Sequence, residues 1–478
     1  MPIQNGARPR RRIGRRTGVA LIVAAVALVL TPTAAQATST PAQIATAKAN
    51  GVTYLKTLQA ADGSFVTGGL SNEWAFSALG AAGTAAVDVT PGGDTTKNAR
   101  KVYQSQLSAS TWPNASPVVT DYERGVLNAY AAGIDPARVS ASRDLIANVV
   151  AGWQPSNPGY YGPPANFNGT VFAVLALAGA KTQAGVARVP QALLNASVTV
   201  IRANQPTDGG WNYNQAAGNP TQLAAASDID MTGATMAAMC VAGVPNTDTA
   251  VVAAKNFLKS NYNTATGGFN SSFGANTDSN AWAVSGLNAC GFTPQGTDFT
   301  GPAPAKKTPI DFLLAAQVTG GGFKYMPSNS TATSYSSIDA ERAIAGAGFT
   351  GTPPTPVTAG QSQWTAASGF TSGTASTLAV IIDNGTGNVL PCSVSITPTA
   401  TTSTLGAVLD AAKTAATPSG CVASIVPTSG TATITAINGT ANSGSNTWKV
   451  SIDGSTLTSA TRGTVIHVGD TIYLHYGS

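Results

Sequence analysis

A short helix-like segment that recurs along the chain constrains the fold more than any other feature. "LSNEWAFSALGAAG" and "DSNAWAVSGLNACG" superpose without a gap. Six segments share this frame: 70–83, 120–133, 166–179, 230–243, 278–291 and 335–348. Each opens with residues that cap helices, continues as an apolar run of small residues, and ends at a glycine suited to stopping a helix. We therefore expect helices that end at Gly83, Gly133, Gly179, Gly243, Gly291 and Gly348.

A second helix is predicted ahead of these segments. Clear examples cover residues 51–59, 198–205, 253–262 and 309–317. Three of them run into a shared turn, in which a glutamine is followed by a glycine and then by an aromatic residue. The turns are Gln59…Gly63-Ser64-Phe65, Gln205…Gly209-Gly210-Trp211 and Gln317…Gly321-Gly322-Phe323. Recurrence of this kind predicts helix pairs packed side by side.

These turns, in register with the repeats, resemble the glutamine–aromatic motif of the prenyltransferase and squalene-cyclase toroids. The resemblance covers about residues 42–350. It implies an α6/α6 toroid, with the small-residue segments as inner helices and each glutamine tying an outer helix end to the aromatic turn. A fold resemblance does not specify a function.

The pattern changes after a Pro/Thr/Gly linker at residues 351–365. Five stretches then alternate like strands, and one amphipathic helix is predicted at 404–415. The strand-like stretches are 377–383, 392–397, 431–437, 447–453 and 471–476. We therefore expect a small β-grasp-like α+β domain over residues 366–478, behind an all-α toroid over residues 38–350.

The ending "WKVSIDG…HVGDTIYLHYG" resembles the C-terminal β domain of transcobalamin and intrinsic factor. In that family an α6/α6 toroid precedes the β domain, so the resemblance extends to the order of the domains. It implies a ligand held between the toroid mouth and the β domain, and it makes a cobalamin-like corrinoid the named candidate.

Residues 1–37 have the composition of a signal peptide. Six arginines precede a short apolar run at 19–30, and Ala35-Gln36-Ala37 is typical of a cleavage site before Thr38. The apolar run is too short to span a membrane as a helix. We expect a secreted, extracellular chain with no transmembrane segment after cleavage.

Charge excludes a nucleic-acid partner. Of the 26 Lys and Arg residues, six lie in the signal peptide, which leaves 20 basic against 21 acidic residues in the rest of the chain. The basic excess therefore belongs to the export signal. Nucleic-acid binding needs a basic surface, which this balance does not predict.

Four cysteines in an exported chain predict two disulfides. We expect Cys392–Cys421 in the C-terminal domain, and Cys240–Cys290 between the ends of two adjacent inner helices. No cysteine belongs to a C-x-x-C pair or lies near a histidine in the sequence, so a zinc site is not expected.

Asp230 raises the question of acid catalysis. The stretch Asp228-Ile229-Asp230-Met231-Thr232 is one residue away from D-x-D-D-T, and it resembles the acid motif of class II terpene cyclases. In the repeat frame, however, Asp230 takes the position of Thr120 and Asp278, at the start of a helix. We therefore expect Asp230 to cap a helix, and we keep it as the weak candidate for a catalytic acid.

Other chemistries lack their residues. The two histidines, His467 and His475, both lie in the C-terminal domain, which leaves the toroid without the ligands of zinc prenyltransferases and without a Ser-His-Asp triad. No metal or required cofactor is expected. The three glutamates, Glu73, Glu123 and Glu341, all fall on inner helices and leave carboxylate-based glycan chemistry open.

The starts of the inner helices should gather at one end of the toroid and form a polar mouth with aromatic walls. The predicted ligand-binding residues are Asn72, Glu73, Asp121, Glu123, Asn168, Asp228, Asp230, Trp211, Tyr213, Asp278, Asn280 and Trp282. These residues favour an exported, non-catalytic protein that binds a medium-sized amphipathic ligand. The alternatives are an enzyme using the same cavity, terpene-cyclase-like or glycan-active, and a surface adhesion or scaffold protein.

Overall fold

The computed structural model describes residues 38–65, 71–214, 226–303, 305–457 and 459–478. The predicted signal peptide lies outside the described residues, as does the side chain of Asn72. Within the described residues, no helix is both long and apolar enough to cross a membrane.

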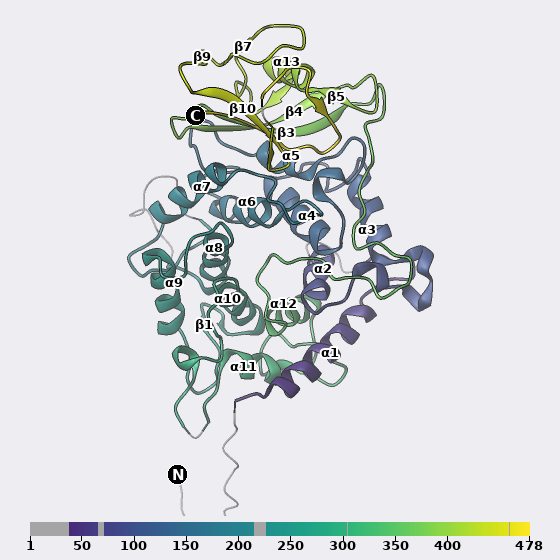
Figure 1. Ribbon diagram of the computed structural model, residues 1–478. Helices are drawn as coiled ribbons and strands as arrows, with labels where there is room; N and C mark the ends of the chain where they lie inside the picture. The colour runs from purple at the N-terminus through teal and green to yellow at the C-terminus, as the bar shows by residue number, and fades with distance from the viewer. Residues whose placement is uncertain (1–37, 66–70, 215–225, 304, 458) are drawn as a thin grey trace, which may run out of the picture.

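The helical part of the chain forms a ring (Figure 1). Helices α2, α4, α6, α8, α10 and α12 contact one another in a closed cycle, because α12 also packs against α2. Their bounds are Ser71–Ala81 (α2), Val119–Ala131 (α4), Phe167–Gly179 (α6), Ile229–Val241 (α8), Thr277–Ala289 (α10) and Ser334–Ile344 (α12). Each covers one of the predicted small-residue segments, so a helical ring followed by a sheet domain is confirmed.

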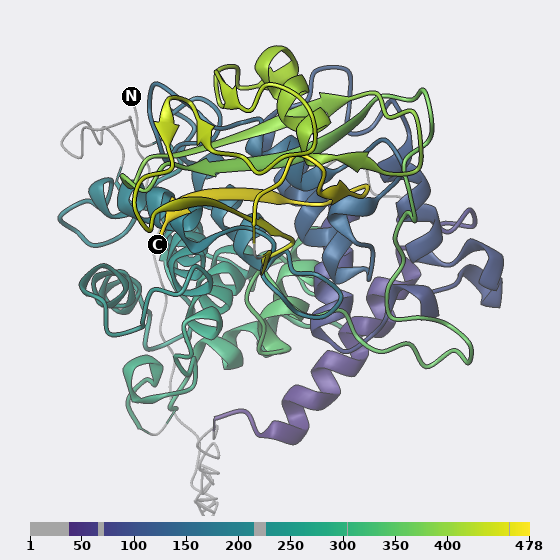
Figure 2. The same cartoon turned by 45° about the horizontal axis from the view of Figure 1, so that its top comes forward.

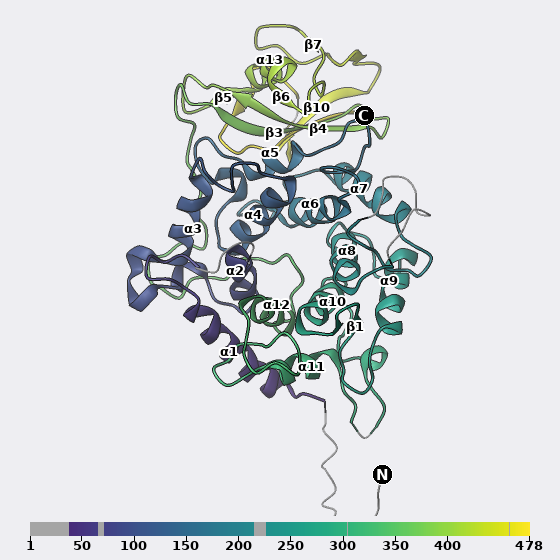
Figure 3. The same cartoon turned by 180° about the vertical axis from the view of Figure 1, so that it is seen from behind.

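The helices between them line the outside of the ring (Figures 1 and 3). Their bounds are Pro41–Thr57 (α1), Ala99–Ser108 (α3), Leu145–Val150 (α5), Gln191–Ala203 (α7), Thr249–Ser260 (α9) and Pro309–Ala316 (α11). The sequence pattern predicted a second helix ahead of each inner segment and gave residue ranges for α1, α7, α9 and α11. Helices α3 and α5 fill the remaining places without the glutamine turn.

The predicted glutamine turns are built as expected. The Nε2 group of Gln205 donates to the backbone O of Gly209, 2.8 Å away, and to that of Ala250 in the next outer helix, 2.9 Å away. Gln59 makes the corresponding pair of bonds to Gly63 and Val89. The aromatic residue of each turn, Phe65, Trp211 or Phe323, is buried behind it.

Two predicted helix stops differ from the structure. Gly83, Gly133, Gly243 and Gly291 follow their helices with positive φ, as a left-handed stop requires. Gly179 is instead the last residue of α6, and Gly346 rather than Gly348 takes the left-handed position after α12. After this turn the chain brings Phe349 into the ring, where its side chain packs against Trp282.

The segment 348–354 crosses the end of the ring where the inner helices stop. A Cβ atom on Gly179 would lie 2.7 Å from the Thr350 side chain, and one on Gly348 would lie 2.8 Å from Ala289. A side chain at either glycine would push this segment away. The ring is therefore closed at one end by its own chain.

The C-terminal domain contains a six-stranded sheet in the order β11-β10-β13-β3-β4-β6, covered on one face by α13 (Leu405–Ala415). Among the strand pairs of this sheet in the described residues, β13–β3 is the parallel one. The strands are Ser376–Asp383 (β3), Val389–Ile396 (β4), Ala416–Thr417 (β6), Thr447–Ile452 (β10), Ser455–Thr456 (β11) and Ile472–Gly477 (β13).

Two-residue strands complete the structure: Asn270–Ser271 (β1), Gly274–Ala275 (β2), Ser403–Thr404 (β5), Ile425–Val426 (β7), Ala436–Ile437 (β8), Thr440–Ala441 (β9) and Val465–Ile466 (β12). The strand expected over 431–437 is only β8.

Strand β3 is buried on both faces, which explains its unbroken apolar run. Leu378, Val380 and Ile382 belong to the core beneath α13. Ala379 and Ile381 point the other way and belong to the core of the helical ring. Helix α5 packs on this second face, and Figure 2 shows the sheet lying across the outer helices. The sheet domain is thus fixed to the outer wall of the ring.

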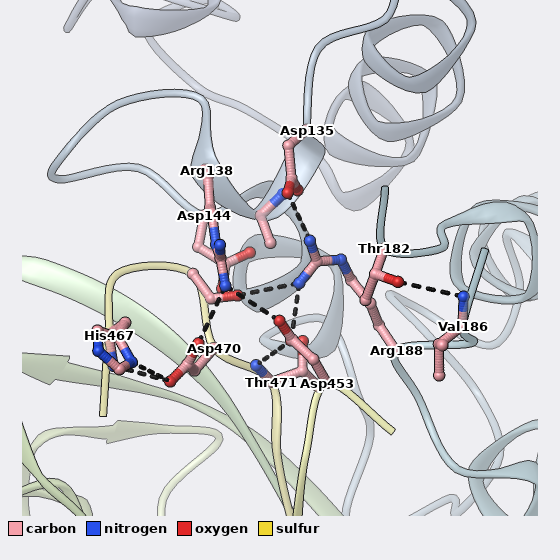
Figure 4. A network of polar contacts seen from close by, with 12 residues as sticks. Asp135, Arg138, Asp144, Thr182, Val186, Arg188, Asp453, His467, Asp470 and Thr471 are labelled. Carbon is pink, nitrogen blue, oxygen red and sulfur yellow. Dashed lines mark hydrogen bonds and ion pairs between the residues drawn. The ribbon is translucent and has the colours of Figure 1, made fainter. Parts of the chain in front are cut away.

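A buried ionic network reinforces this contact (Figure 4). The guanidinium of Arg188, 1% exposed at the side chain, contacts Asp135 at 2.6 Å and Asp453 of the C-terminal domain at 2.7 Å. Arg138 contacts Asp453 and Asp470, both at 3.1 Å. Two arginines of the helical part thus form ion pairs with two carboxylates of the sheet domain.

Two glycine turns lie next to the acidic residues of this network in the sequence. A Cβ atom on Gly454 would collide with the backbone O of Ala187, and one on Gly469 with that of Ala137. Both glycines have positive φ. Only glycine allows the two domains to approach this closely at these points.

The Pro/Thr/Gly linker is held along the ring. The carboxylate of Asp88 accepts hydrogen bonds from the backbone N–H groups of Val357 and Thr358 at 2.8 and 2.9 Å. The Trp364 ring packs edge-on against Tyr130, with centroids 4.9 Å apart. Residues 351–365 therefore follow one defined path.

This arrangement corrects the expectation that the β domain covers the toroid mouth. Figures 1 and 3 show the sheet domain beside the ring and over neither end. The physical reason is the apolar second face of β3 together with the ions around Arg188, which would all lose their partners if the domain moved over the mouth.

Both predicted disulfides are present. Cys240–Cys290 joins the ends of α8 and α10 with a Cα–Cα distance of 5.2 Å. Cys392–Cys421 links β4 to the segment beyond α13, with a Cα–Cα distance of 6.2 Å.

We expect Arg188→Ala to destabilise the protein by about 3 kcal/mol, because it leaves Asp135 buried without its partner. The matched control is Arg202→Ala, which removes an exposed ion pair with Asp248 and should cost less than about 1 kcal/mol. Urea unfolding at neutral pH measures both losses. Equal losses would contradict the proposed role of the buried network.

Candidate functional site

An aromatic cluster fills the centre of the ring. Trp74 on α2, Phe172 on α6 and Trp282 on α10 come from alternate helices of the cycle. The Phe172 ring centroid lies 6.1 Å from that of Trp74 and 5.8 Å from that of Trp282. Phe349, from the crossing segment, lies 5.2 Å from Trp282. These rings form the floor of a cup that opens toward the starts of the inner helices.

One buried cation lies on this floor. The guanidinium carbon of Arg342 sits 4.7 Å from the Phe349 ring centroid and 5.6 Å from that of Trp74. Its Nη2 group donates to Asp339 Oδ1 at 2.6 Å. Asp339 also accepts a hydrogen bond from Trp282 Nε1 at 3.0 Å. Arg342 is therefore both stacked and paired.

A cavity of about 150 Å³ lies over this floor. Its lining combines aromatic faces with the Asp339–Arg342 pair. The lining residues are Trp74, Trp282, Tyr335, Ile338, Asp339, Arg342 and Phe349. An apolar wall with a few convergent polar groups is the usual composition of a small-molecule site. Larger hollows elsewhere, such as that of about 510 Å³ between α1 and α11, are open surface grooves.

Two further carboxylates stand at the starts of α8 and α10. Asp230 and Asp278 take the same place, the second residue of their helices. The helix backbones touch there: a Cβ atom on Gly233 would lie 2.5 Å from the Trp282 backbone O, and one on Gly286 would collide with Gly233. Together with the disulfide at the far end, this contact fixes the two carboxylates relative to each other.

Both carboxyl groups resist ionisation. Burial raises the pKa of Asp230 to about 6, and the charges of Asp228 and Asp339 add to the rise. Burial raises the pKa of Asp278 to about 7, with further contributions from Asp339 and Asp230. One oxygen of each carboxyl is buried without a hydrogen-bond partner. Near neutral pH these groups can donate as well as accept hydrogen bonds.

The structure corrects the capping role expected of Asp230. The N-cap of α8 is Asp228, whose carboxylate accepts a hydrogen bond from the backbone N–H of Met231 at 2.7 Å. Asn276 caps α10 in the same way, ahead of Asp278. The repeat frame was off by two residues, because the capping side chain precedes the first helical turn. Neither Asp230 nor Asp278 therefore caps its helix.

Glu73 and Asp121 are occupied by partners within the protein. The carboxylate of Glu73 accepts hydrogen bonds from Trp112 Nε1 at 2.9 Å and Arg124 Nε at 2.7 Å. Asp121 accepts from Arg124 at 2.9 Å and from the backbone N–H of Val118 at 3.0 Å. This group ties α2 to α4 and leaves little capacity for a ligand.

Three other predicted ligand residues are buried and do not line the cavity. Trp211 is 0% exposed and donates to the backbone O of Ile201, so it packs between α7 and α8. Asn280 is buried and donates to the backbone O of Pro309 on α11. Glu123 is buried with both oxygens unpartnered, and burial holds its pKa well above its usual range.

Two predicted residues remain beside the mouth without a defined role. Tyr213 is 53% exposed ahead of α8, and Asn168 is half-buried in the first turn of α6. Sequence reasoning missed Arg342, Tyr335 and Phe349 as site residues. The i,i+3 spacing of Asp339 and Arg342 was the available signal for the first of them. Phe349 had none, because only the path of the chain after α12 brings it inward.

Neither a protein-family model nor a curated protein sequence matches this chain. Similar solved structures include a variant of the type II terpene cyclase MstE from Scytonema, in complex with geranylgeranyl dihydroxybenzoate. It is 11% identical over 64% of this chain and 96% of that chain, with a TM-score of 0.44. Haptocorrin in complex with Cbi is 12% identical over 91% of this chain and 97% of that chain, with a TM-score of 0.35. A glycosidase in complex with glucose is 13% identical over 64% and 96%, with a TM-score of 0.41. These likenesses carry no inference about function.

We expect the pKa of Asp278 to fall in Asp339→Asn, and to fall less in Asp230→Asn, because the charge of Asp339 contributes more to its rise. Carbon-13 NMR of the aspartate carboxyls measures both shifts, with exposed Asp62 as an internal control. The folded pKa lies above the unfolded value of about 3.9, so stability from Asp278 should be lost as pH rises from about 4 to about 7. An unchanged Asp278 titration in both variants would contradict the cluster.

We expect Asp228→Ala to cost about 1 kcal/mol through loss of the α8 cap. Asp230→Asn should cost nothing through capping, and above pH 6 it should be neutral or stabilising, because it removes a carboxyl that burial keeps from ionising. Thermal unfolding at pH 8 compares the two variants. A larger loss in Asp230→Asn than in Asp228→Ala would restore the capping role to Asp230.

Proposed function

We propose that the chain is an exported, non-catalytic binding protein, in which a ring of six helix pairs holds a medium-sized amphipathic ligand at its open end. The observation that carries the proposal is the cup itself. An aromatic floor and the Asp339–Arg342 pair line one cavity, and Asp230 and Asp278 lie near it at the starts of the adjacent helices α8 and α10.

The two sides of the cup supply different interactions. Trp74 and Trp282 offer flat apolar surfaces to a ring or hydrocarbon group. Asp230 and Asp278 each keep one buried oxygen without a hydrogen-bond partner, and Asp339 is already satisfied by Arg342 and Trp282. A ligand with an apolar body and hydroxyl or amide groups at one edge would satisfy both sides.

Cobalamin remains the named candidate ligand, with a changed binding geometry. A cavity of about 150 Å³ is below the range of about 300–1,000 Å³ usual for whole-ligand pockets. A corrinoid would therefore rest across the mouth with one edge inside. The C-terminal domain would support the ring wall without covering the ligand.

A second function, acid catalysis on a polyene, is favoured by one observation. The pKa of Asp230 is raised to about 6 by burial, so its carboxyl can carry a proton in an aromatic-lined ring. The neighbouring position is Met231, however, which cannot strengthen the acid. Turnover of squalene by the protein that disappears in Asp230→Asn would establish this function in place of simple binding.

We expect cobalamin, or another amphipathic member of a thermal-shift panel, to bind and to quench tryptophan fluorescence. Trp282→Ala should weaken that binding at least tenfold, since it removes one wall of the cavity. Trp364→Ala is the matched control, because Trp364 lies on the linker outside the cup. Calorimetric titration measures the affinities. Equal binding by the two variants would exclude the cup as the site.

A further inference from the structure

Among the described residues that line the cup cavity, Arg342 is the cation. Its side chain is only 2% exposed. Burying a guanidinium costs free energy unless it is paired and hydrogen-bonded. Asp339 supplies the pair, through one hydrogen bond at 2.6 Å. The remaining hydrogen-bond donors of Arg342 therefore decide which polar groups the cavity can hold.

The guanidinium of Arg342 is held in place by both neighbouring inner helices. Helix α12 packs against α10 on one side and α2 on the other (Figure 3). Arg342 Nε donates to Ser285 Oγ of α10 at 3.5 Å, and Nη1 donates to Ser77 Oγ of α2 at 3.4 Å. The ring centroids of Trp74 and Phe349 lie 5.6 and 4.7 Å from the guanidinium carbon. The cation thus has a defined position without a ligand.

This cation keeps spare hydrogen-bond donors. A guanidinium has one N–H on Nε and two on each terminal nitrogen. Within the part of the chain that the structure describes, Arg342 donates once from each nitrogen, to Ser285, Ser77 and Asp339. One N–H on each terminal nitrogen is therefore left for another acceptor. The bonds to the two serines are also long, so they compete weakly with an added acceptor.

Asp339 does not take up the spare donors. Its Oδ1 accepts the one bond from Arg342, and its Oδ2 accepts from Trp282 Nε1 at 3.0 Å. The carboxylate is thus divided between the cation and an indole N–H. A carboxylate that pairs fully with arginine uses both of its oxygens on the planar guanidinium. The spare donors of Arg342 are therefore complementary to a second carboxylate, which the ligand would supply.

We propose that Arg342 binds the carboxylate of a ligand whose flat, apolar body packs against the aromatic lining of the cup. This inference rests on the proposed function and adds the charge of the ligand: an aromatic or similarly flat carboxylic acid. A cavity of about 150 Å³ has room for one benzene ring. Tyr335 lines the same cavity and is 49% exposed, so this side of the cavity lies next to solvent.

Two acidic residues near Asp339 set the conditions of the test. Burial raises the pKa of Asp230 to about 6 and that of Asp278 to about 7, and the charge of Asp339 adds to both. When ionised, these groups repel an anion at Arg342. A simple carboxylic acid is still ionised at pH 6, because its pKa is about 4. Titrations at pH 6 therefore keep the ligand charged and remove part of the repulsion.

The probes are phenylacetate, 2-phenylacetamide and 2-phenylethylamine. They share a phenyl ring and a methylene group, and at pH 6 they are anionic, neutral and cationic. Phenylacetate should bind about tenfold tighter than phenylacetamide, because hydrogen bonds between charged groups are stronger than neutral ones. Phenylethylamine should bind more weakly than the amide. Calorimetric titration of the protein measures the three affinities.

Variants of Arg342 test whether this residue recognises the carboxylate. Arg342→Gln should abolish the preference for the acid over the amide. Arg342→Lys should reduce it, because lysine keeps the charge and lacks the planar fork. Arg188→Gln is the matched control, since Arg188 is an equally buried, ion-paired arginine at the interface with the sheet domain. It should lose stability and keep the preference for the acid.

A further variant should strengthen the preference. Asp339→Asn removes the carboxylate that competes for Arg342, so the ratio of acid to amide affinity should rise. Misfolding cannot produce a gain of this kind. Together with the wild-type affinities, this variant decides the question even where the Arg342 variants do not fold.

The outcomes separate the two proposals. If none of the three probes binds, the proposed function fails at this cup for ligands of this size, and the carboxylate with it. If all three bind and weaken in Trp282→Ala, but the amide or the amine equals the acid, the cup stands and the role of Arg342 is overturned. A preference for the acid that survives in both Arg342 variants, or falls in Asp339→Asn, would also overturn it. Acid binding that Trp282→Ala leaves unchanged would place the anion elsewhere, with the same consequence.

Discussion

The closed ring depends on hydrogen bonds from glutamine side chains at the ends of outer helices. Gln317 Nε2 donates to the backbone O of Gly321 in its own turn and to that of Ala47 in the first helix, at 2.9 and 2.8 Å. The bond to Ala47 joins residues 270 positions apart and links the last outer helix to the first, where the ring closes. The cup requires this closure, because Trp74 and Asp339 come from the first and last inner helices.

Small residues determine how closely the inner helices approach, and through that the chemistry of the site. Gly233 and Gly286 bring α8 and α10 into backbone contact. Two helix starts that close together place Asp230 and Asp278 beside each other, with limited access to water. Their raised pKa values follow first from this burial, and the charge of the nearby Asp339 adds to both.

The C-terminal domain contributes stability to the ring wall, and the structure gives it no place over the mouth. Its sheet has two apolar faces, one for α13 and one for α5, so it is shared between two cores. Arg188 and Arg138 then fix its orientation through ion pairs.

Local pattern determined the elements of this protein, because capping residues, glycine stops and apolar periodicity act within a few residues of one another. The repeated helices and the strand-rich C-terminal part were predictable on that basis. The closed ring was implied by the resemblance to the toroid families, and the disulfides by the even number of cysteines. The pattern misplaced the α8 cap, and assigned Trp211 and Asn280 to the ligand, since it cannot tell which face of a helix meets the axis. Only the tertiary structure decided where the C-terminal domain packs on the ring. It also decided that Phe349 and Arg342 complete the aromatic floor of the cup, because ring closure brings these residues to Trp74.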